Sequence, residues 1–145
     1  MIVAHGSRFG GHALYVKDGK VRYTYNFLGI DEKHFTADLP SPGKHIVGVE
    51  FTREGTDEDQ QGVGTTELYV DDEQADEGPM RAIGVQFSLC GEGLTVGYDG
   101  GDRVTTDYPH RFEFTNGEII QVVFDVAGGT YADAENQLTA LMARD

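Results

Sequence analysis

The chain has little cysteine and little proline. Its 145 residues include one cysteine, Cys90, so it cannot form a disulfide within itself. It has 4 prolines against 20 glycines, and frequent glycine without low-complexity runs is typical of an all-β chain with many tight turns. The length fits a single domain over residues 1–145.

Basic residues are also scarce. Lysine and arginine together number 11, against 25 aspartates and glutamates, which gives a formal net charge of −14 at pH 7. Nucleic acids and anionic membranes carry the same sign of charge and would repel such a surface. We therefore expect neither nucleic acid nor a membrane as a partner.

Long apolar runs are missing from the sequence as well. No stretch of 18 apolar residues is present, and residues 1–15 lack the charged start and apolar core of a secretory signal peptide. These features predict a soluble, cytoplasmic protein, although a domain excised from a longer chain would show the same features.

Common catalytic patterns are absent too. The sequence has no GxSxG motif, no P-loop, no dinucleotide fingerprint and no HExxH among its five histidines. Cys90 lies in Cys-Gly-Glu-Gly, without a CxxC partner or a histidine nearby in sequence to activate it. The acidic residues cluster in turns (57–59, 71–73 and 76–77) instead of pairing along a strand face, as a glycosidase would require. We expect no catalytic residues and no enzyme activity in this chain.

What the sequence does contain is alternation. The stretch GGHALYVKDGKVRYTYNFLG, residues 10–29, alternates apolar and polar side chains, breaks at Asp18-Gly19 and then resumes. An Asp-Gly pair tolerates the positive φ angles of a two-residue hairpin turn. The stretch therefore predicts a β-hairpin.

Similar short runs recur along the chain. We predict strands at 45–52, 65–70, 74–77, 84–89, 94–97, 111–114 and 117–126, and an exposed loop over the polar residues 53–64. Roughly ten short strands separated by turns predict an all-β fold, a two-sheet antiparallel β-sandwich.

The end of the chain has a different period. Residues 133–144 place Ala134, Leu138, Leu141 and Met142 on one helical face, and Asp133 is suited to cap the first turn. This pattern predicts a short C-terminal α-helix. So short a helix is marginal by itself and must pack on another surface.

Aromatic side chains on the hairpin form the first candidate binding site. Tyr15, Tyr23 and Tyr25 recur along it, together with Phe27. Such residues either pack within a sheet or present a surface to a ligand or to another domain. The sequence leaves both interpretations open.

An acidic, glycine-rich stretch forms the second candidate binding site. Residues 96–108 include Asp99, Asp102 and Asp107 among three glycines and two threonines. Calcium takes carboxylate, carbonyl and hydroxyl oxygens from flexible loops of this kind, although the stretch does not match the EF-hand pattern. Aspartates that cap their own turns give the same composition without a metal, so a calcium site is one of two interpretations.

Several stretches resemble the C-terminal region of large bacterial arylsulfatases. They are IVAHGSRFGGHALYVKDGKVRYTYNFLGIDE, LPSPGKHIVGVEF, GVGTTELYVDDEQADEG, FSLCGEGLTVGYDGGDRVTTDY and FEFTNGEIIQVVFDV. In that family the region is similar to a GGWSLYVKDGK hairpin, an LPAGKH turn and an LYVDG segment, and the ending QLTALMARD looks like the family's closing helix. The similarity covers nearly all of the chain and keeps the order of the motifs.

The resemblance implies a concanavalin-like or laminin-G-like sandwich of the jelly-roll type, attached to a sulfatase catalytic domain. It implies a non-catalytic accessory domain that packs on the catalytic domain, in the same chain or in another, or shapes access to it. A free-standing glycan-binding, lectin-like module is the alternative, with carbohydrate as its partner.

The departures from the family also matter. His12 stands where a tryptophan is common, and Cys90 where an acidic residue is common. The catalytic formylglycine of the family arises within a Cys-x-Pro-x-Arg motif, which the surroundings of Cys90 do not match. The resemblance therefore places the hydrolysis of sulfate esters outside this chain.

Overall fold

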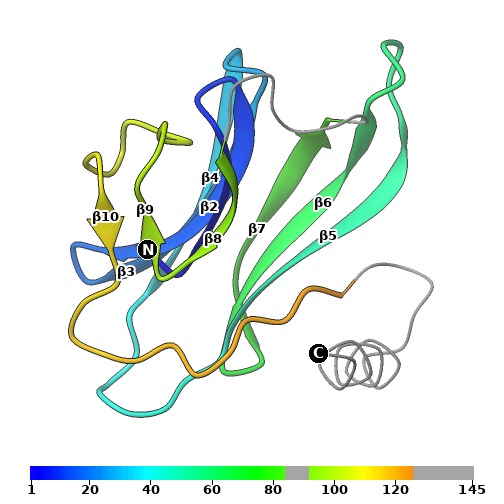
Figure 1. Cartoon of the computed structure of the whole chain (residues 1–145). Helices are drawn as coiled ribbons and strands as arrows, with labels where there is room; N and C mark the ends of the chain where they lie inside the picture. The colour runs from blue at the N-terminus through cyan, green and yellow to red at the C-terminus, as the bar shows by residue number, and fades with distance from the viewer. Residues whose placement is uncertain (84–91, 126–145) are drawn as a thin grey trace, which may run out of the picture.

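The computed structural model describes residues 1–83 and 92–125. This part of the chain forms ten β-strands and no helix, and the strands pair antiparallel throughout. Figure 1 shows two main layers facing each other. The predicted all-β sandwich is confirmed, while the predicted helix at 133–144 lies outside the described residues.

The larger layer, sheet A, has five strands in the order β4-β3-β2-β1-β8. Their bounds are β1 Val3–Ser7, β2 Gly10–Lys17, β3 Lys20–Phe27, β4 Asp31–Asp38 and β8 Glu92–Val96. The predicted hairpin forms β2 and β3. Asp18 and Gly19 connect them with φ angles of 51° and 71°, the left-handed conformations expected of an Asp-Gly turn.

The smaller layer, sheet B, has three strands in the order β5-β6-β7. They are β5 Val47–Thr56, β6 Gly62–Val70 and β7 Glu73–Ala82. A further two-stranded sheet, sheet C, pairs β9 Tyr98–Asp99 with β10 Phe112–Glu113. Within sheets A and B, neighbouring strands follow one another along the chain, except for β1 and β8. The described strands thus form two meanders, whereas a jelly roll pairs its strands as Greek keys.

Some predicted boundaries are wrong. The predicted loop over 53–64 is shorter, because β5 continues to Thr56 and β6 starts at Gly62. Residues 117–125 were expected to form a strand but belong to none. Three strands, β1, β4 and the two-residue β9, were not predicted from the sequence. The strand expected at 84–89 lies outside the described residues.

Both faces of sheet A are covered. The first face packs on sheet B and forms the inter-sheet core, of Val3, Leu14, Val21, Tyr23, Tyr25, Phe27, Phe35, Ala37, Leu68 and Met80. The second face carries a smaller outer core of Met1, Ala4, Ala13, Tyr15, Val104 and Tyr108, with Phe112 packed against them. Three residues of this outer core come from residues 99–113, which we call the outer segment. The alternation of β2 and β3 thus supplies two cores at once.

Candidate functional site

The three hairpin tyrosines lie in the interior. Tyr23 and Tyr25 face the inter-sheet core, and Tyr15 faces the outer core. Tyr15 follows Leu14, the cross-strand partner of Tyr23, and adjacent positions of a strand point to opposite faces. Their exposed fractions are 0% for Tyr15, 7% for Tyr23 and 3% for Tyr25. Burial raises the pKa of each phenol. The structure therefore uses all three rings for packing and leaves none of their faces open to a ligand.

The three aspartates of the acidic stretch are held apart by different partners. Asp99 is buried and accepts a hydrogen bond from the Tyr108 hydroxyl. Asp102 lies at the surface, 3.5 Å from Nε of Arg8. In residues 1–83 and 92–125, no group of three or more histidine, cysteine or acidic side chains is arranged to hold a metal ion. The expected convergence of Asp99, Asp102 and Asp107 on one cation is not found.

Asp107 is the most heavily bonded of the three. Its carboxylate accepts hydrogen bonds from Nη1 of Arg22 at 3.1 and 3.2 Å and from the Tyr15 hydroxyl, and Nζ of Lys17 lies 3.5 Å away. Burial by itself would raise the pKa of Asp107, but the Tyr15 hydrogen bond and the two cations outweigh it and hold this pKa below its usual value. Asp107 thus fastens the outer segment to β2 and β3.

Two other polar side chains complete this attachment. Asn26, 3% exposed, donates through Nδ2 to the carbonyl oxygens of Arg8 and Val104 at 3.0 and 2.7 Å. Tyr108 accepts a hydrogen bond from the Val104 backbone at 3.1 Å while it donates to Asp99. Burial and the neighbouring Asp99 carboxylate both raise the pKa of Tyr108. These bonds satisfy polar groups that the outer core encloses.

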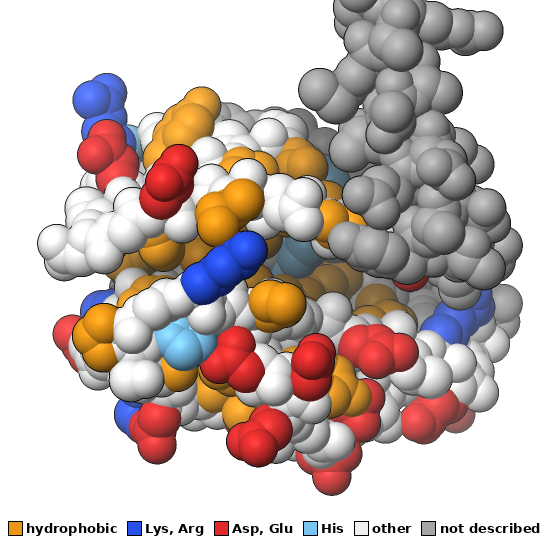
Figure 2. Space-filling model, turned by 90° about the horizontal axis from the view of Figure 1, so that it is seen from below, with side chains coloured by type: hydrophobic (Ala, Val, Ile, Leu, Met, Phe, Trp, Pro, Cys, Tyr) orange, Lys and Arg blue, Asp and Glu red, His pale blue; other side chains and the backbone are white. Residues whose placement is uncertain are grey.

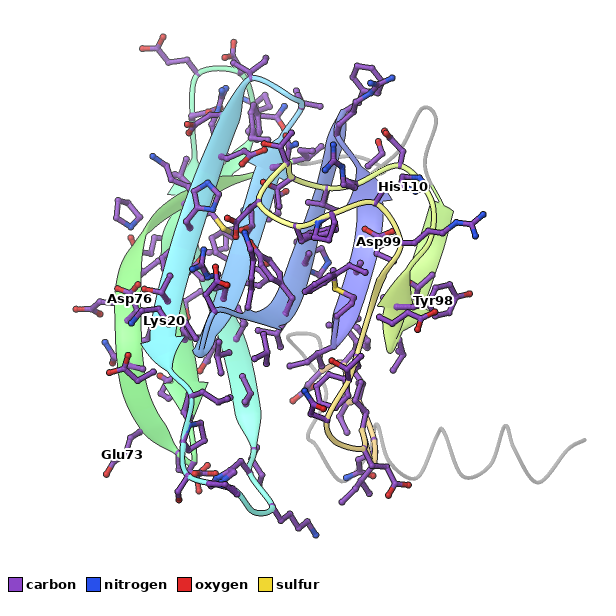
Figure 3. All side chains as sticks on the ribbon, turned by 90° about the vertical axis from the view of Figure 1, so that its left-hand side faces the viewer. Lys20, Glu73, Asp76, Tyr98, Asp99 and His110 are labelled. Carbon is purple, nitrogen blue, oxygen red and sulfur yellow. The ribbon has the colours of Figure 1, made fainter. Side chains whose placement is uncertain are left out.

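The outer segment presents sheet C to the solvent on its far side. Tyr98 and Glu113 are direct partners across β9 and β10, so their side chains share the outward face. Tyr98 is 50% exposed, while its neighbour Asp99 points inward and is 3% exposed. With Gly100 and Arg111 they surround a shallow cavity of about 340 Å³. Figure 3 shows Tyr98 and Asp99 at the side of the molecule away from Lys20 and Asp76.

A larger cavity of about 470 Å³ lies where the ends of β3 and β4 meet β6 and β7. Among its charged lining residues, Lys20, Asp38 and Asp71 are paired with other side chains or with the backbone. Nζ of Lys20 lies 2.7 Å from Asp38, and the backbone of Thr36 donates to Asp76 at 2.9 Å. Asp71 accepts from the Ile46 backbone at 3.0 Å and pairs with His45. We interpret this cavity as the joint between the two sheets.

Acidic side chains dominate the outer face of sheet B. Glu50, Glu67 and Glu77 lie opposite one another across β5, β6 and β7. The Tyr69 hydroxyl donates to Glu67 at 2.7 Å, and this bond, together with the carboxylate charges, raises the pKa of Tyr69 to about 12. Figure 2, which views the molecule from below, shows acidic side chains along one side of a hollow that contains hydrophobic ones.

Sequence reasoning missed Tyr98, Arg111 and Glu113 as a group. Within residues 96–108 only the aspartates were candidates for a binding site. Tyr98 and Glu113 are cross-strand partners in the structure, and the sequence gives no sign of this pairing. One signal in the sequence was usable, the glycine that precedes Tyr98, because glycine often marks a turn. In the structure Gly97 has a φ of 83° and turns the chain between β8 and β9.

Comparison with known proteins adds no relative. No family model, no curated protein and no solved structure matches this chain. Within residues 1–83 and 92–125, no helix has the length and apolar character needed to span a membrane.

Proposed function

We propose that this chain is a non-catalytic accessory domain of an arylsulfatase, which packs on a sulfatase catalytic domain in cis or in trans and shapes access to it. The resemblance of its motifs to the C-terminal region of that family supports the proposal. The Lys17–Lys20 turn, the LYVDD segment at β6 and the DRVTTDY part of the outer segment all serve the scaffold. This use of the motifs agrees with a structural role for the domain.

The observation that carries the proposal is a set of exposed apolar side chains at one edge of the molecule. We call it the edge patch; its members are Leu94 and Val96 of β8 and Ile120, Val123 and Phe124 further along, all between 44% and 69% exposed. The second stretch begins close to the end of β8, because a Cβ atom at Gly97, directly after Val96, would lie 4.0 Å from Cδ1 of Ile119, directly before Ile120. Apolar patches on an otherwise acidic surface mark docking sites for other proteins.

The charges of the described residues fit this role better than catalysis. Asp107, Asp99 and Asp71 are each engaged by neighbouring groups, as a scaffold requires. We therefore propose that the isolated chain does not hydrolyse aryl sulfates. Turnover of 4-nitrophenyl sulfate that persists through repurification and is lost on substitution of a carboxylate would contradict this part of the proposal.

The test of docking needs a sulfatase catalytic domain, which this proposal expects to be encoded in the same gene or in a neighbouring one. We expect the two purified proteins to form a complex in size-exclusion chromatography with light scattering. The double variant Leu94→Lys/Val96→Lys removes two members of the edge patch and should abolish the complex. Ile30→Lys is the matched control, because Ile30 is 79% exposed but lies between β3 and β4, at the opposite edge of sheet A.

Two results would count against the docking role. The first is the absence of a complex between unmodified proteins at concentrations where both remain folded. The second is equal loss of binding in Ile30→Lys and in the edge-patch variant, since that would mean a general effect of added charge.

A free-standing glycan-binding module is the second candidate function. The observation that favours it is the exposed ring of Tyr98 beside hydrogen-bonding side chains. The complex with the catalytic domain separates the candidates: glycan hits without any such complex favour the lectin-like module, whereas a complex that the edge-patch variant abolishes favours the accessory domain, with or without glycan hits.

A further inference from the structure

We propose that the outward face of sheet C is a binding site for one unit of a neutral saccharide. The site consists of Tyr98, Arg111 and Glu113 around the 340 Å³ cavity. It does not depend on docking at the edge patch, and it differs from the hairpin tyrosines that the sequence suggested.

The ring of Tyr98 supplies the stacking surface. An aromatic face is negative and attracts the weakly positive C–H groups that line one side of a pyranose ring. Tyr98 is 50% exposed, so one side of it is open to a ligand. A Cβ atom at Gly100 would lie 3.5 Å from two carbons of this ring, in ordinary van der Waals contact, so Gly100 lies beside the ring without a side chain of its own to cover it.

Two side chains beside the ring supply the hydrogen bonds. Glu113 is the cross-strand partner of Tyr98, and Arg111, two residues before Glu113, lines the same cavity. A carboxylate accepts from sugar hydroxyl groups and a guanidinium donates to their oxygens, so the pair matches neighbouring hydroxyls that both donate and accept. The cavity has the volume of a small site, near the lower end of the ~300–1,000 Å³ range of small-molecule pockets.

The backbone conformation of Arg111 sets where its side chain starts. Its φ of 60° is in the left-handed region, which six other non-glycine residues of the described part of the chain also adopt, among them Asp18 in the β2–β3 turn. Here the conformation precedes β10 and brings Arg111 to the cavity that Tyr98 and Glu113 line.

The residues beneath the site are packed and hydrogen-bonded before any ligand binds. Beneath it, Phe112 stacks on Tyr108 with ring centroids 5.5 Å apart, and Tyr15 packs against Tyr108 at 5.0 Å. Asp99, next to Tyr98, is fixed by the Tyr108 hydroxyl. A fixed site loses little conformational entropy on binding, which matters for a ligand that makes few contacts.

Charge selects a neutral ligand. Glu113 and Asp99 both line the cavity, against Arg111 as its one cationic side chain. The whole chain carries a formal charge of −14. Uronic acids and sulfated sugars would meet this field and be repelled.

The test is an NMR titration of ¹⁵N-labelled protein with the methyl glycosides of glucose, galactose, mannose and N-acetylglucosamine. We expect saturable shifts at residues 97–100 and 111–113 for at least one sugar, with affinity in the millimolar range. Tyr98→Ala should weaken binding about tenfold, whereas Tyr98→Phe, which keeps the ring, should retain it. Tyr69→Ala is the matched control on sheet B and should bind like the unmodified protein.

Three results would overturn the proposal. One is the absence of saturable shifts at any of these residues with all four glycosides. Another is equal binding by Tyr98→Ala and the unmodified protein when both give folded spectra. The third is tighter binding of methyl glucuronide or glucose 6-sulfate than of the neutral sugars, since this would reverse the assigned class of ligand.

Discussion

The two faces of sheet A are covered in different ways. On one face, sheet B contributes apolar side chains such as Leu68 and Met80 to a core of ten buried residues. On the other face, the outer segment contributes Val104 and Tyr108 to a core of six, and polar bonds from Asp107 and Asn26 surround it. Sheet B is held on sheet A by burial of apolar area, and the outer segment is held by hydrogen bonds and ion pairs as well.

This difference indicates that sheet B contributes more to the stability of the fold, whereas the outer segment contributes more to the fixed position of sheet C. Apolar burial stabilises in proportion to area and does not depend on direction. Hydrogen bonds add less net free energy but require particular geometry. The inter-sheet core therefore accounts for most of the stability, while the polar bonds of the outer segment hold sheet C, with Tyr98 on its surface, in one position.

The largest effect should come from the inter-sheet core. Leu68 of β6 is fully buried, so Leu68→Ala removes packed methyl groups and leaves a cavity between the sheets. We expect a loss of about 3 kcal/mol in the free energy of unfolding, measured by urea denaturation. A loss below that of Val104→Ala, in the outer core, would contradict the ranking of the two cores.

The next largest effect should come from Asp107. Asp107→Asn leaves Arg22 and Lys17 without their carboxylate, and we expect a loss of about 2 kcal/mol. The control is Asp38→Asn, which breaks the exposed pair with Lys20 and should leave the unfolding midpoint unchanged. Equal effects from the two substitutions would mean that the outer segment is held by burial alone.

The same comparison shows what the sequence can reveal. The β2–β3 hairpin was predictable because its signals, the alternation and the Asp18-Gly19 turn, are local. β4 was missed because it is an edge strand, in which only Phe35 and Ala37 turn their side chains into the core. Residues 117–125 were predicted as a strand on their apolar alternation, but a strand also needs an edge to pair with, and a pattern within one segment does not show this.

The candidate site was harder to predict than the fold for the same reason. Asp107 binds Arg22, 85 residues earlier in the chain, and Tyr98 faces Glu113 only because β9 and β10 pair. The buried tyrosines illustrate the opposite error. The β2–β3 hairpin has Tyr15 on one face and Tyr23 on the other, so an exposed aromatic surface would follow only if one face of the hairpin were left uncovered. Here both faces are covered.

A pH titration sharpens the comparison, because the two faces respond to acid differently. Burial, together with the charge of His5, lowers the pKa of His12 in the inter-sheet layer from 6.5 to about 4. The unfolded chain binds this proton more readily, so His12 destabilises the fold as the pH falls from about 6.5 towards 4. Asp107, with its lowered pKa, loses its contribution only below the usual carboxyl range.

We therefore expect the His12 contribution to reduce the free energy of unfolding by about 1 kcal/mol between pH 7 and pH 5.5. Urea denaturation of the unmodified chain and of His12→Gln at both pH values isolates this contribution. The variant should show the smaller dependence on pH in this window, and Asp107→Asn should show the same dependence as the unmodified chain. Identical slopes for His12→Gln and the unmodified chain would contradict the assignment.

The smallest effect should come from calcium, for which we expect no change in stability. Asp99 is occupied by Tyr108, Asp102 lies beside Arg8, and Asp107 is neutralised by Arg22 and Lys17, so a cation would have to displace these partners one by one. A bound ion at a hundredfold excess over its dissociation constant would stabilise the fold by about 2.7 kcal/mol, which thermal unfolding detects easily. Equal midpoints in calcium and in a chelator are the expected result. A higher unfolding midpoint in calcium that is lost in Asp102→Asn would contradict this expectation. It would mean that the outer segment binds a metal ion, and that its attachment to sheet A depends on this ion instead of on the side chains of β2 and β3.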